Sequence, residues 1–495
     1  MPSFLKKAAL VLAVIVLAVV GFVVWSLNSQ TSDLAPDATT GLNPQLVEAD
    51  PQWIPSVSLP KPAGWAANEA PVAAPGLKVM RFATGLDHPR TMLTLPNGDV
   101  LVAETNAPAG NKPGGLTGMA MAWMMNRVGA GTPSPDRIVL LRDADGDGRA
   151  EQVAQFRSAD LRSPSGMAYA DGKLYVANHD AVLEFAFQPG ATKLEGKPLR
   201  KLMDLPPAGN HWMRNLLLAP DAKHLYVAVG SSSNIAENGM EAEAGRAAIW
   251  EIDLDTGRRR QFAAGMRNPN GMGWNPSSGE MWAVVQERDM LGPDLVPDYL
   301  TNVPVGAQYG WPWIYWKNVF DDRVQWDMET YMLEYTRKPE YAMGAHAAVL
   351  GLTFAQGGNR LGKGFENGAV IARHGSWNRR PAAGYDVVFV PFDANGNPRD
   401  VKPRIILSGF LNQSGNARGR PTWVAWDKAG ALLVSDDTAG VIWRVVNPTA
   451  APAPEIKPTV TEHMKPLKEI KDPTNPANAP TLTGGFRKED DKLLP

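Results

Sequence analysis

Histidine and arginine residues precede several apolar segments of this chain, where they could do acid–base and anion-binding chemistry. His211 stands just before one apolar segment, and Arg267 with Asn268 stands before the next. Arg418 and Arg420 stand before a segment near the C-terminus. An imidazole can accept a proton near neutral pH, and guanidinium groups suit a ligand that carries carboxylates. The alternative is that these residues hydrogen-bond the ends of strands within a sheet.

Acidic side chains offer one further candidate site. Asp143, Asp145 and Asp147 have the spacing with which a calcium-binding loop begins. The twelfth position of that loop is an alanine, so the carboxylate that would close it is missing. We therefore expect an acidic hairpin turn here, with calcium as the alternative.

Asp436 and Asp437 end another apolar segment, and we expect them to cap a strand.

The amino-acid composition excludes several classes of function. The 495 residues carry a net charge of −2 at pH 7, so no basic excess exists to bind nucleic acid. The chain has no cysteine, which excludes disulfides, thiolate zinc sites and cysteine nucleophiles. The motifs of dinucleotide-binding folds, P-loops, serine-hydrolase elbows and zinc proteases are also absent. Abundant glycine (47) and proline (42) instead favour many short strands with tight turns.

A weak internal repeat positions the candidate residues. Its unit is a corner of small residues, Pro or Asn, then an apolar strand, a turn and a second apolar strand. The turns carry dipeptides such as Asn-Gly and Asp-Gly, which suit hairpins. Copies lie at residues 89–103, 164–177, 215–228, 269–283, 349–372 and 421–434, with third strands expected at 182–187, 248–252, 387–391 and 441–445. One such sheet cannot bury both faces, so six copies around an axis predict an all-β, six-bladed β-propeller. In that fold, the candidate histidine and arginines converge on one mouth of the central channel.

Two long insertions interrupt the repeats, at 106–136 and 287–346. The first contains a Met-rich segment, Thr117–Val128. We expect this segment to be a helix packed as a flap, because methionine fills irregular gaps in a core. Contact with a membrane or a substrate is the alternative.

The N-terminus predicts a membrane anchor. Lys6 and Lys7 precede an uncharged run, Ala8 to Leu27, about as long as a bilayer span. The run is longer than the apolar core of a cleaved signal peptide, which is the alternative. The lysines place residues 1–7 in the cytoplasm and the rest in the periplasm or another extracytoplasmic space. We expect a transmembrane helix at 8–27, a linker and extended arm at 28–78, the propeller at 79–448 and a Pro-rich tail at 449–495.

Several short motifs follow one another in a characteristic order. They are His211, Arg267-Asn-Pro-Asn-Gly271, Gln286-Glu-Arg-Asp289, Asp294 and Asp298, Tyr309-Gly-Trp-Pro312, His374-Gly-Ser-Trp-Asn-Arg379, Arg418-Gly-Arg-Pro421 and Ser435-Asp-Asp437. Across nearly all of residues 80–446, the chain thereby resembles the glucose/sorbosone dehydrogenase family, and within it the L-sorbosone dehydrogenase-like branch. The resemblance implies a six-bladed propeller that binds pyrroloquinoline quinone (PQQ) and Ca²⁺. It also implies oxidation of a sugar or aldose-like substrate outside the cytoplasm, with an electron acceptor that the sequence does not identify.

The resemblance also implies roles for single residues. His211 is similar to the general base that takes the substrate hydroxyl proton while hydride goes to the quinone, and Arg267 is similar to the arginine that polarises the quinone carbonyl. Cofactor binding is implied for Asn268, Arg379, Arg418 and Arg420, and metal binding for Asp289 and Asp294. Glucose-oxidising members often carry Asp where this chain has Asn210, and their calcium loop differs from the loop Glu287–Pro293. These departures argue against glucose as the substrate.

Two other functions remain open from the sequence. A calcium-dependent, lactonase-like hydrolase on the same propeller would need metal-ligating carboxylates and Asn side chains that project into the channel. A non-catalytic propeller that binds a sugar, a peptide or an envelope partner would depend on neither a quinone nor His211.

Overall fold

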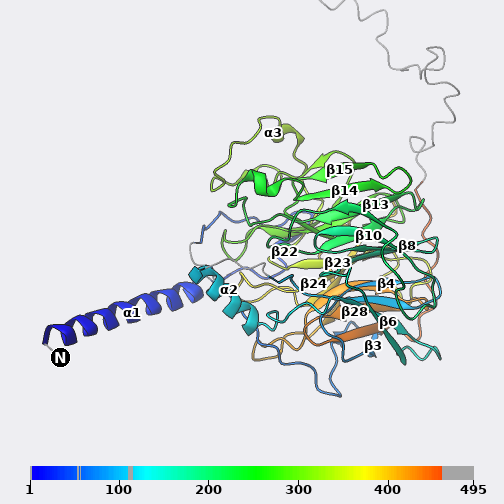
Figure 1. Cartoon of the computed structure of the whole chain (residues 1–495), viewed down its shortest axis with the longest axis horizontal. Coiled ribbons are helices and arrows are strands. Elements are labelled where there is room, and N and C mark those ends of the chain that lie inside the picture. Colours follow the sequence, from blue (N-terminus) through cyan, green and yellow to red (C-terminus); the bar gives the residue numbers. More distant parts are fainter. Residues whose placement is uncertain (1–2, 30, 53–54, 56, 110–114, 460–495) are drawn as a thin grey trace, which may run out of the picture.

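Six antiparallel sheets make up the body of the chain (Figure 1). The computed structural model describes residues 3–29, 31–52, 55, 57–109 and 115–459, so most of the predicted C-terminal tail lies outside the described residues. We call the sheets blades 1 to 6. Blade 1 contains β4 (Pro89–Thr94), β5 (Val100–Glu104), β6 (Arg137–Arg142) and β7 (Gln152–Arg157); blade 2 contains β8 (Gly166–Ala170), β9 (Lys173–Ala177), β10 (Ala181–Ala186) and β11 (Arg200–Asp204); blade 3 contains β12 (Arg214–Leu218), β13 (His224–Val229), β14 (Ala248–Asp253) and β15 (Arg259–Ala264). Blade 4 contains β16 (Asn268–Trp274), β17 (Met281–Gln286), β18 (Pro297–Asn302) and β22 (Tyr341–Ala345); blade 5 contains β23 (Val349–Phe354), β24 (Gly368–Arg373), β25 (Asp386–Pro391) and β26 (Arg404–Ser408); blade 6 contains β27 (Pro421–Trp426), β28 (Leu432–Asp436), β29 (Val441–Val446) and β3 (Lys78–Ala83).

The blades form a closed ring. The innermost strands β4, β8, β12, β16, β23 and β27 contact one another in turn, and β27 contacts β4. In blade 6, β3 from the N-terminal side pairs antiparallel with β29 from the C-terminal side, with Lys78 opposite Val446. The ring is therefore closed by main-chain hydrogen bonds between the two ends of the chain. The predicted six-bladed propeller is confirmed.

Glycine within two of the innermost strands lets neighbouring blades approach closely. A Cβ atom on Gly271 would lie 2.5 Å from the backbone of Leu350 and Leu352, and one on Gly351 would lie 2.6 Å from Trp423. Any larger side chain at these two positions would push the strands apart. Gly271 and Gly351 are therefore needed because the innermost strands lie very close together around the axis of the propeller.

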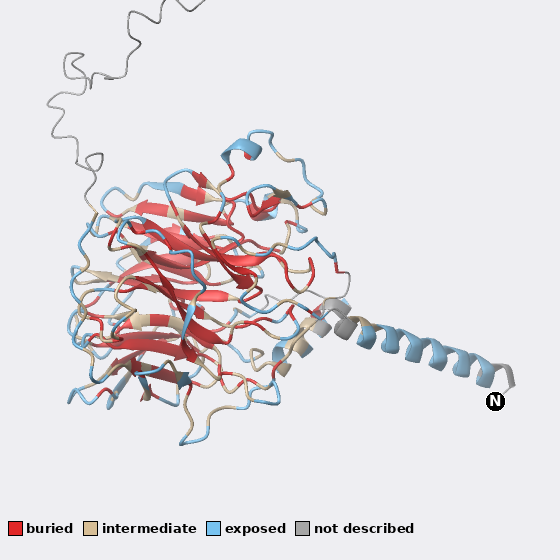
Figure 2. Ribbon diagram, turned by 180° about the vertical axis from the view of Figure 1, so that it is seen from behind, coloured by how far each residue is buried: buried red, intermediate tan, exposed pale blue. Residues whose placement is uncertain are grey.

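The outermost strands β7, β11, β15 and β26 lie outside the predicted repeats. In β7, only Phe156 is buried and the other side chains are wholly or partly exposed. A strand at the rim of a blade has one face and one edge near solvent, so it shows little apolar alternation. The core instead lies between the inner strands of neighbouring blades (Figure 2). There Trp282 packs edge-on against Phe392 at 5.0 Å.

The segment between the first helix and β3 lies along the outside of the propeller. Its strand β1 (Thr40–Gly41) pairs with β22 in blade 4, and β2 (Val72–Ala73) pairs with β26 in blade 5. The predicted insertion at 287–346 contains β18 and β22, so part of it is blade 4 itself. Its remainder carries β19 (Ala307–Gln308), which pairs with β15, the hairpin β20 (Ile314–Tyr315) and β21 (Val319–Phe320), and the short helix α3 (Met332–Tyr335).

Two longer helices lie outside the blades. Helix α1 (Ser3–Ser29) contains a 21-residue stretch, Lys6–Ser26, of mean hydropathy 3.0 that is not buried in the propeller. By length and composition it could cross a membrane. Helix α2 (Gly115–Arg127) falls where the Met-rich segment was predicted to be helical. One face of α2 packs as expected, since Gly118 is buried and Met121 and Met124 are half-buried. The prediction of a packed flap is wrong for Met119 and Trp123, which lie on the other face and are 70% and 62% exposed.

Candidate active site

One end of the propeller axis collects the candidate residues, and we call it the mouth. Each innermost strand begins there, as Pro89 pairs with Glu104 and Asn268 with Gln286, the last residues of the second strands. The mouth is built from the loops that precede the first strands and the loops that follow the second strands. These are residues 84–88, 105–136, 158–165, 178–180, 205–213, 230–247, 265–267, 287–296, 346–348, 374–385, 409–420 and 437–440. All the predicted site residues lie in these loops, except Asn268, which is the first residue of β16.

His211 lies in the loop before β12 with one ring nitrogen fixed. Its Nδ1 is 3.0 Å from both the carbonyl oxygen and the hydroxyl of Ser231. That hydroxyl donates to the Ser233 carbonyl at 2.6 Å, so both Ser231 oxygens accept from the ring. Nδ1 therefore carries the proton and Nε2 the lone pair. Nε2 makes no hydrogen bond within the described part of the chain, and burial together with the charge of Arg267 lowers the pKa of His211 to about 3. The imidazole is thus neutral at neutral pH, with a free proton-accepting nitrogen.

Arg267 is held in a fixed position beside His211. Its guanidinium donates to the backbone oxygen of Glu287, to both oxygens of Asn234 and, at 3.1 Å, to the Asp289 carboxylate. The next residue, Asn268, donates to Gln286 Oε1 at 3.0 Å. A Cβ atom on Gly230 would lie within 2.6 Å of both Asn268 and His211, so these two side chains are neighbours. The structure thus brings His211, Arg267 and Asn268 together, as the sequence predicts.

Asp289 lies between two cationic groups. Its Oδ2 accepts from Arg267, and its Oδ1 lies 3.2 Å from Nδ1 of His346 in the loop before β23. The other nitrogen of His346 faces the Gly292 carbonyl at 3.0 Å. Burial would lower the pKa of His346, but the hydrogen bond and charge of Asp289 raise it overall. Likewise, burial would raise the pKa of Asp289, but its hydrogen bond with His346 and the charge of Arg267 lower it. The carboxylate is therefore already neutralised by protein groups.

A second cluster at the mouth was not among the predicted site residues. Arg90, at the start of β4, forms an ion pair of 2.6 Å with Asp437, and Nε2 of His374 lies 3.0 Å from the same carboxylate. Arg90 also lies over the ring of Trp212, 5.6 Å from its centroid, and so reaches from blade 1 to blade 3. Its Nε is buried and has no hydrogen-bond partner among the described residues. The position of Arg90 beside Pro89 in the first repeat is the sequence signal that could have identified it.

Arg420 and Arg418, which were predicted as a pair, have different surroundings. Arg420 donates to the carbonyl oxygens of His374 and Gly375 and lies over the ring of Tyr385 at 5.1 Å. Its Nη1 makes no hydrogen bond within the described residues. Arg418 instead pairs with Glu69 at 3.1 Å and lies over Trp65 at 5.7 Å. Glu69 is 349 residues away from Arg418 in sequence, so the sequence alone could not reveal this ion pair.

Arg379 and Asp294 lie together in a buried pair. Nη2 of Arg379 is 3.0 Å from Asp294 Oδ1, and both groups hydrogen-bond the hydroxyl of Ser32, at 2.8 and 2.7 Å. Nη2 of Arg379 also donates to the Leu34 carbonyl. These contacts fasten the start of the N-terminal arm to the loops at the mouth, which is a structural role. Cofactor binding by Arg379 and metal binding by Asp294 stay predictions.

Two buried carboxyl groups beneath the mouth have unusual acidity. Burial raises the pKa of Glu287 to about 7 and that of Asp298 to about 6. Asp298 accepts hydrogen bonds from the backbone nitrogens of Glu287 and Ala348, at 2.9 and 2.6 Å, and so joins blades 4 and 5. The Glu287 carboxyl accepts from the backbone nitrogen of Arg288 at 3.0 Å.

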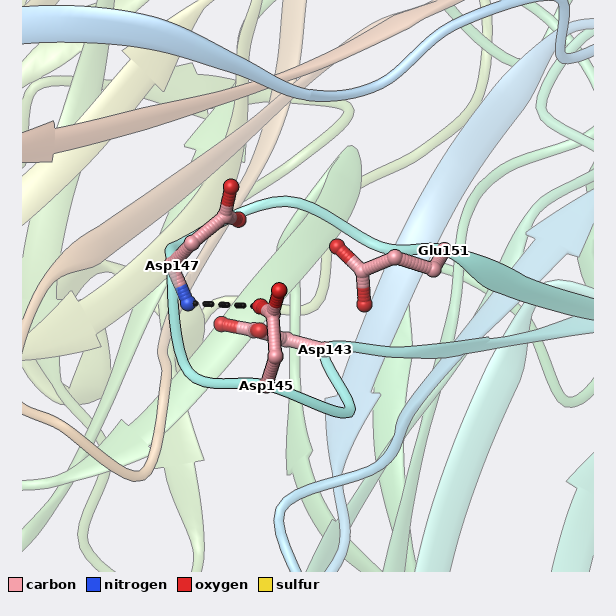
Figure 3. Close-up of side chains that lie close together, drawn as sticks. All are labelled: Asp143, Asp145, Asp147 and Glu151. Carbon is pink, nitrogen blue, oxygen red and sulfur yellow. Dashed lines mark hydrogen bonds between the residues drawn. The ribbon is translucent and has the colours of Figure 1, made fainter.

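The acidic motif at Asp143 is a turn between β6 and β7 (Figure 3). Asp143 accepts hydrogen bonds from the backbone nitrogens of Gly146 and Gly148, and Asp145 accepts one from that of Asp147. Glu151, which the sequence analysis did not include, brings a fourth carboxylate within 4.8 Å of the other three. The turn lies between the third and fourth strands, at the opposite end of the blade from the mouth. The expected hairpin turn is therefore present, and its four carboxylates lie close enough together to hold a metal ion, so calcium stays the alternative at this turn.

Comparisons with known proteins relate the chain to one group. A family model described as TrAA12-like matches residues 139–303 and 319–448. A pyrroloquinoline quinone-dependent sugar dehydrogenase of Hypocrea jecorina is 23% identical over 424 residues, which cover 76% of this chain and 89% of that protein. The iodide structure of the Family AA12 carbohydrate-active enzyme of Trichoderma reesei has a TM-score of 0.62 at 20% identity, covering 76% of this chain and 98% of that one. The holo form of the PQQ domain of pyranose dehydrogenase from Coprinopsis cinerea has a TM-score of 0.58 at 19% identity, covering 78% and 99%.

Proposed function

The chain belongs to the TrAA12-like family, and from this membership we propose that it is a PQQ-dependent dehydrogenase that oxidises a sugar or aldose-like substrate, of the sorbosone type. The names of the Hypocrea and Coprinopsis relatives support this proposal. The observation that carries it is the neutral His211, whose free Nε2 lies at a mouth that also holds Arg90, Arg267 and Arg420.

The donor groups at the mouth suit a cofactor that bears several carboxylates. Arg90 Nε is buried without a partner among the described residues, and burial lowers the pKa of its guanidinium despite the charge of Asp437. A buried guanidinium with an unpaired N–H group is stabilised when an anion binds to it. We propose that Arg90 and Arg420 hold carboxylates of PQQ, with Asn268 as a further polar contact and Arg418 at the rim. When bound, the quinone accepts the hydride that leaves the substrate carbon.

The protein's own groups then handle the proton. Nδ1 of His211 is committed to Ser231, so the proton of a substrate hydroxyl can be taken only at Nε2. The imidazolium that forms would be stabilised by the carboxylate of Asp289, whose charge favours the protonated form of His211. Arg267, held in place by Asn234 and the Glu287 carbonyl, would supply a fixed positive charge to polarise a bound quinone.

The carboxylates predicted as metal ligands do not fit a calcium site as they lie. Asp289 pairs with Arg267 and His346, and Asp294 pairs with Arg379 and Ser32. A cation would have to displace these donors and would meet their positive charge. We therefore route no step through calcium. The same pairing gives no support to a metal-dependent hydrolase at these carboxylates.

We further propose that α1 anchors the protein in a membrane with the propeller on the extracytoplasmic side. Lys6 and Lys7 at its start and the length of Lys6–Ser26 support this orientation. Extraction of membranes at alkaline pH should leave the full-length protein in the pellet. Recovery of a soluble form beginning near residue 30 would show instead that the helix is a cleaved signal.

Addition of PQQ tests the activity directly. Purified apoprotein should bind PQQ with a change in quinone absorbance and should then reduce an artificial dye in the presence of a sugar from a panel that includes sorbosone and aldoses. The double variant Arg90→Ala/Arg420→Ala should bind PQQ more weakly, with circular dichroism used to select conditions in which it is still a folded propeller despite the loss of the Arg90–Asp437 ion pair. If wild-type protein neither binds PQQ nor reduces dye with any sugar, the proposal is wrong.

A further inference from the structure

The chain length between α1 and the propeller restricts where the membrane can lie. Helix α1 ends at Ser29, and Ser32 is buried between Asp294 and Arg379. Three residues can span at most about 10 Å, whatever direction the helix takes. Asp294 and Arg379 belong to the loops at 287–296 and 374–385, which form part of the mouth. The end of α1 must therefore lie at the same end of the propeller as His211.

Helix α2 emerges from this end as well. Its insertion connects β5 to β6 where Glu104 and Arg137 pair, and its base is fixed when Thr132 hydrogen-bonds His88, the residue before β4, at 2.6 Å. Figure 1 shows α2 beside the inner end of α1, and the opposite view in Figure 2 shows the same neighbourhood. Two separate segments thus project from the mouth side near each other.

The side chains of α2 are unusual for a helix in water. Met119 and Trp123 lie one turn apart and are 70% and 62% exposed, and Met125 is 40% exposed. The helix has no acidic residue, and its one charged residue, Arg127, lies in the last turn. Trp is enriched at the boundary between lipid tails and headgroups, and a cation next to it suits phosphate headgroups.

From these observations, we propose that α2 is an interfacial membrane helix. It inserts Met119 and Trp123 into the outer surface of the bilayer that α1 crosses, and so holds the mouth of the propeller toward the lipid. This inference rests on the proposed anchoring by α1, and does not depend on the proposed dehydrogenase activity. A sugar would then enter the mouth along the membrane surface instead of from the bulk solution.

The absence of cysteine makes a direct test possible, because a single introduced cysteine can be labelled selectively. Full-length Met119→Cys and Trp123→Cys, each carrying a fluorophore, are reconstituted into phospholipid vesicles with nitroxide-labelled lipids. The matched control is Leu199→Cys, which is 58% exposed and lies between β10 and β11, at the end opposite the mouth. A second control is Leu12→Cys in α1, 62% exposed, which reports the anchor alone.

Labels at 119 and 123 should be quenched more by a shallow nitroxide lipid than by a deep one, at a depth of about 5–10 Å below the headgroups. The label at 199 should not be quenched, and the label at 12 should be quenched by the deep lipid. Since the two α2 positions are labelled separately, failure of one variant to fold leaves the other to decide.

Three results would overturn the inference. If the label at position 12 is quenched but the labels at 119 and 123 are quenched no more than the label at 199, α1 crosses the membrane and α2 is not an interfacial helix. No quenching at 12 would show that the anchoring itself is absent. A label at 123 that is immobilised and shielded from water but unquenched would indicate a protein partner in place of lipid.

Discussion

Nη1 of Arg90 lies 2.6 Å from Oδ2 of Asp437, and this ion pair joins blade 1 to blade 6 at the mouth. The same carboxylate lies 3.0 Å from Nε2 of His374, in the loop after the second strand of blade 5. Burial would raise the pKa of Asp437, but the charges of His374 and Arg90 hold it far below its usual range. One carboxylate therefore fixes side chains from two other blades around the channel.

Asp437→Asn should destabilise the propeller. The substitution leaves Arg90 buried without its counter-charge, which typically costs about 3–5 kcal/mol. Urea unfolding at pH 7 should show this loss, whereas Glu195→Gln, which removes a fully exposed pair with Lys193, should leave the free energy of unfolding almost unchanged. Because the pKa of Asp437 is lowered on folding, its contribution is present above the ordinary carboxyl pKa and is lost as pH falls. The difference between the variant and the wild type should therefore shrink in acid; a difference that is small at every pH would contradict the role given to Asp437.

Arg420→Ala should weaken PQQ binding more than Arg418→Ala does. Arg420 is oriented by two carbonyl oxygens and Tyr385, with Nη1 left without a protein partner in the described part of the chain. Loss of one charge-assisted hydrogen bond, about 1.5–3 kcal/mol, corresponds to about a 10- to 100-fold higher Kd. The charge of Arg418 is already balanced by Glu69. Titration of each apoprotein with PQQ measures both values, and equal losses would show that the ion pair with Glu69 does not matter.

Much of the fold could be predicted from the sequence because the inner strands carry a strong signal. The predicted strand pairs correspond to the two innermost strands of each blade, and the predicted third strands to β10, β14, β25 and β29. The outer strands could not be predicted, since in β15 the first three residues are exposed and only Phe262 and Ala263 are buried. The closing pair of β3 with β29 joins opposite ends of the chain, and nothing local marks it.

The site was predicted less completely for a related reason. His211, Arg267 and Asn268 belong to neighbouring corners of the repeat, so their convergence follows from the fold alone. Arg379 also belongs to a loop at the mouth. Its side chain, however, binds Ser32 in the N-terminal arm, which is 347 residues away in sequence. Pairings of this length decide whether an arginine is free for a ligand, and a repeat pattern carries no information about them.

Glu287→Gln should stabilise the protein at neutral and alkaline pH. Burial raises the pKa of Glu287 from about 4.5 to about 7, so the folded state holds a proton that the unfolded state has lost in this range. The wild type therefore loses stability as pH rises from about 4.5 to about 7, by a few kcal/mol. An amide keeps an oxygen for the Arg288 nitrogen and does not ionise. Thermal unfolding at pH 5 and pH 8 checks this: the two proteins should be similar at pH 5, and the variant should unfold at the higher temperature at pH 8. A variant that is equally destabilised at both values would refute the titration of Glu287.

His211→Gln should produce a folded protein that binds PQQ and is nearly inactive. The amide cannot accept a proton near pH 7, and loss of a positioned base costs on the order of 10²–10⁴ in kcat. PQQ affinity should be almost unchanged, because Arg90 and Arg420 remain. The matched control is His224→Gln, at the start of β13 near the opposite end of blade 3, which should keep full activity.

The free energy of unfolding in acid tests the protonation state of His211 independently of enzyme activity. Burial lowers its pKa to about 3, so in the wild type the unfolded state alone binds a proton at this residue as pH falls from about 6.5 toward 3. His211 therefore costs stability in acid, and His211→Gln should be more stable than the wild type at pH 4.5 by on the order of 2 kcal/mol relative to their difference at pH 8. Urea unfolding of the two apoproteins at both pH values measures this difference. If the variant shows this gain in acid and also retains most of its turnover on a confirmed sugar, His211 is a buried neutral imidazole but not the base. If it shows no gain, the imidazole is already protonated in the folded protein, and the tautomer that leaves Nε2 free is wrong.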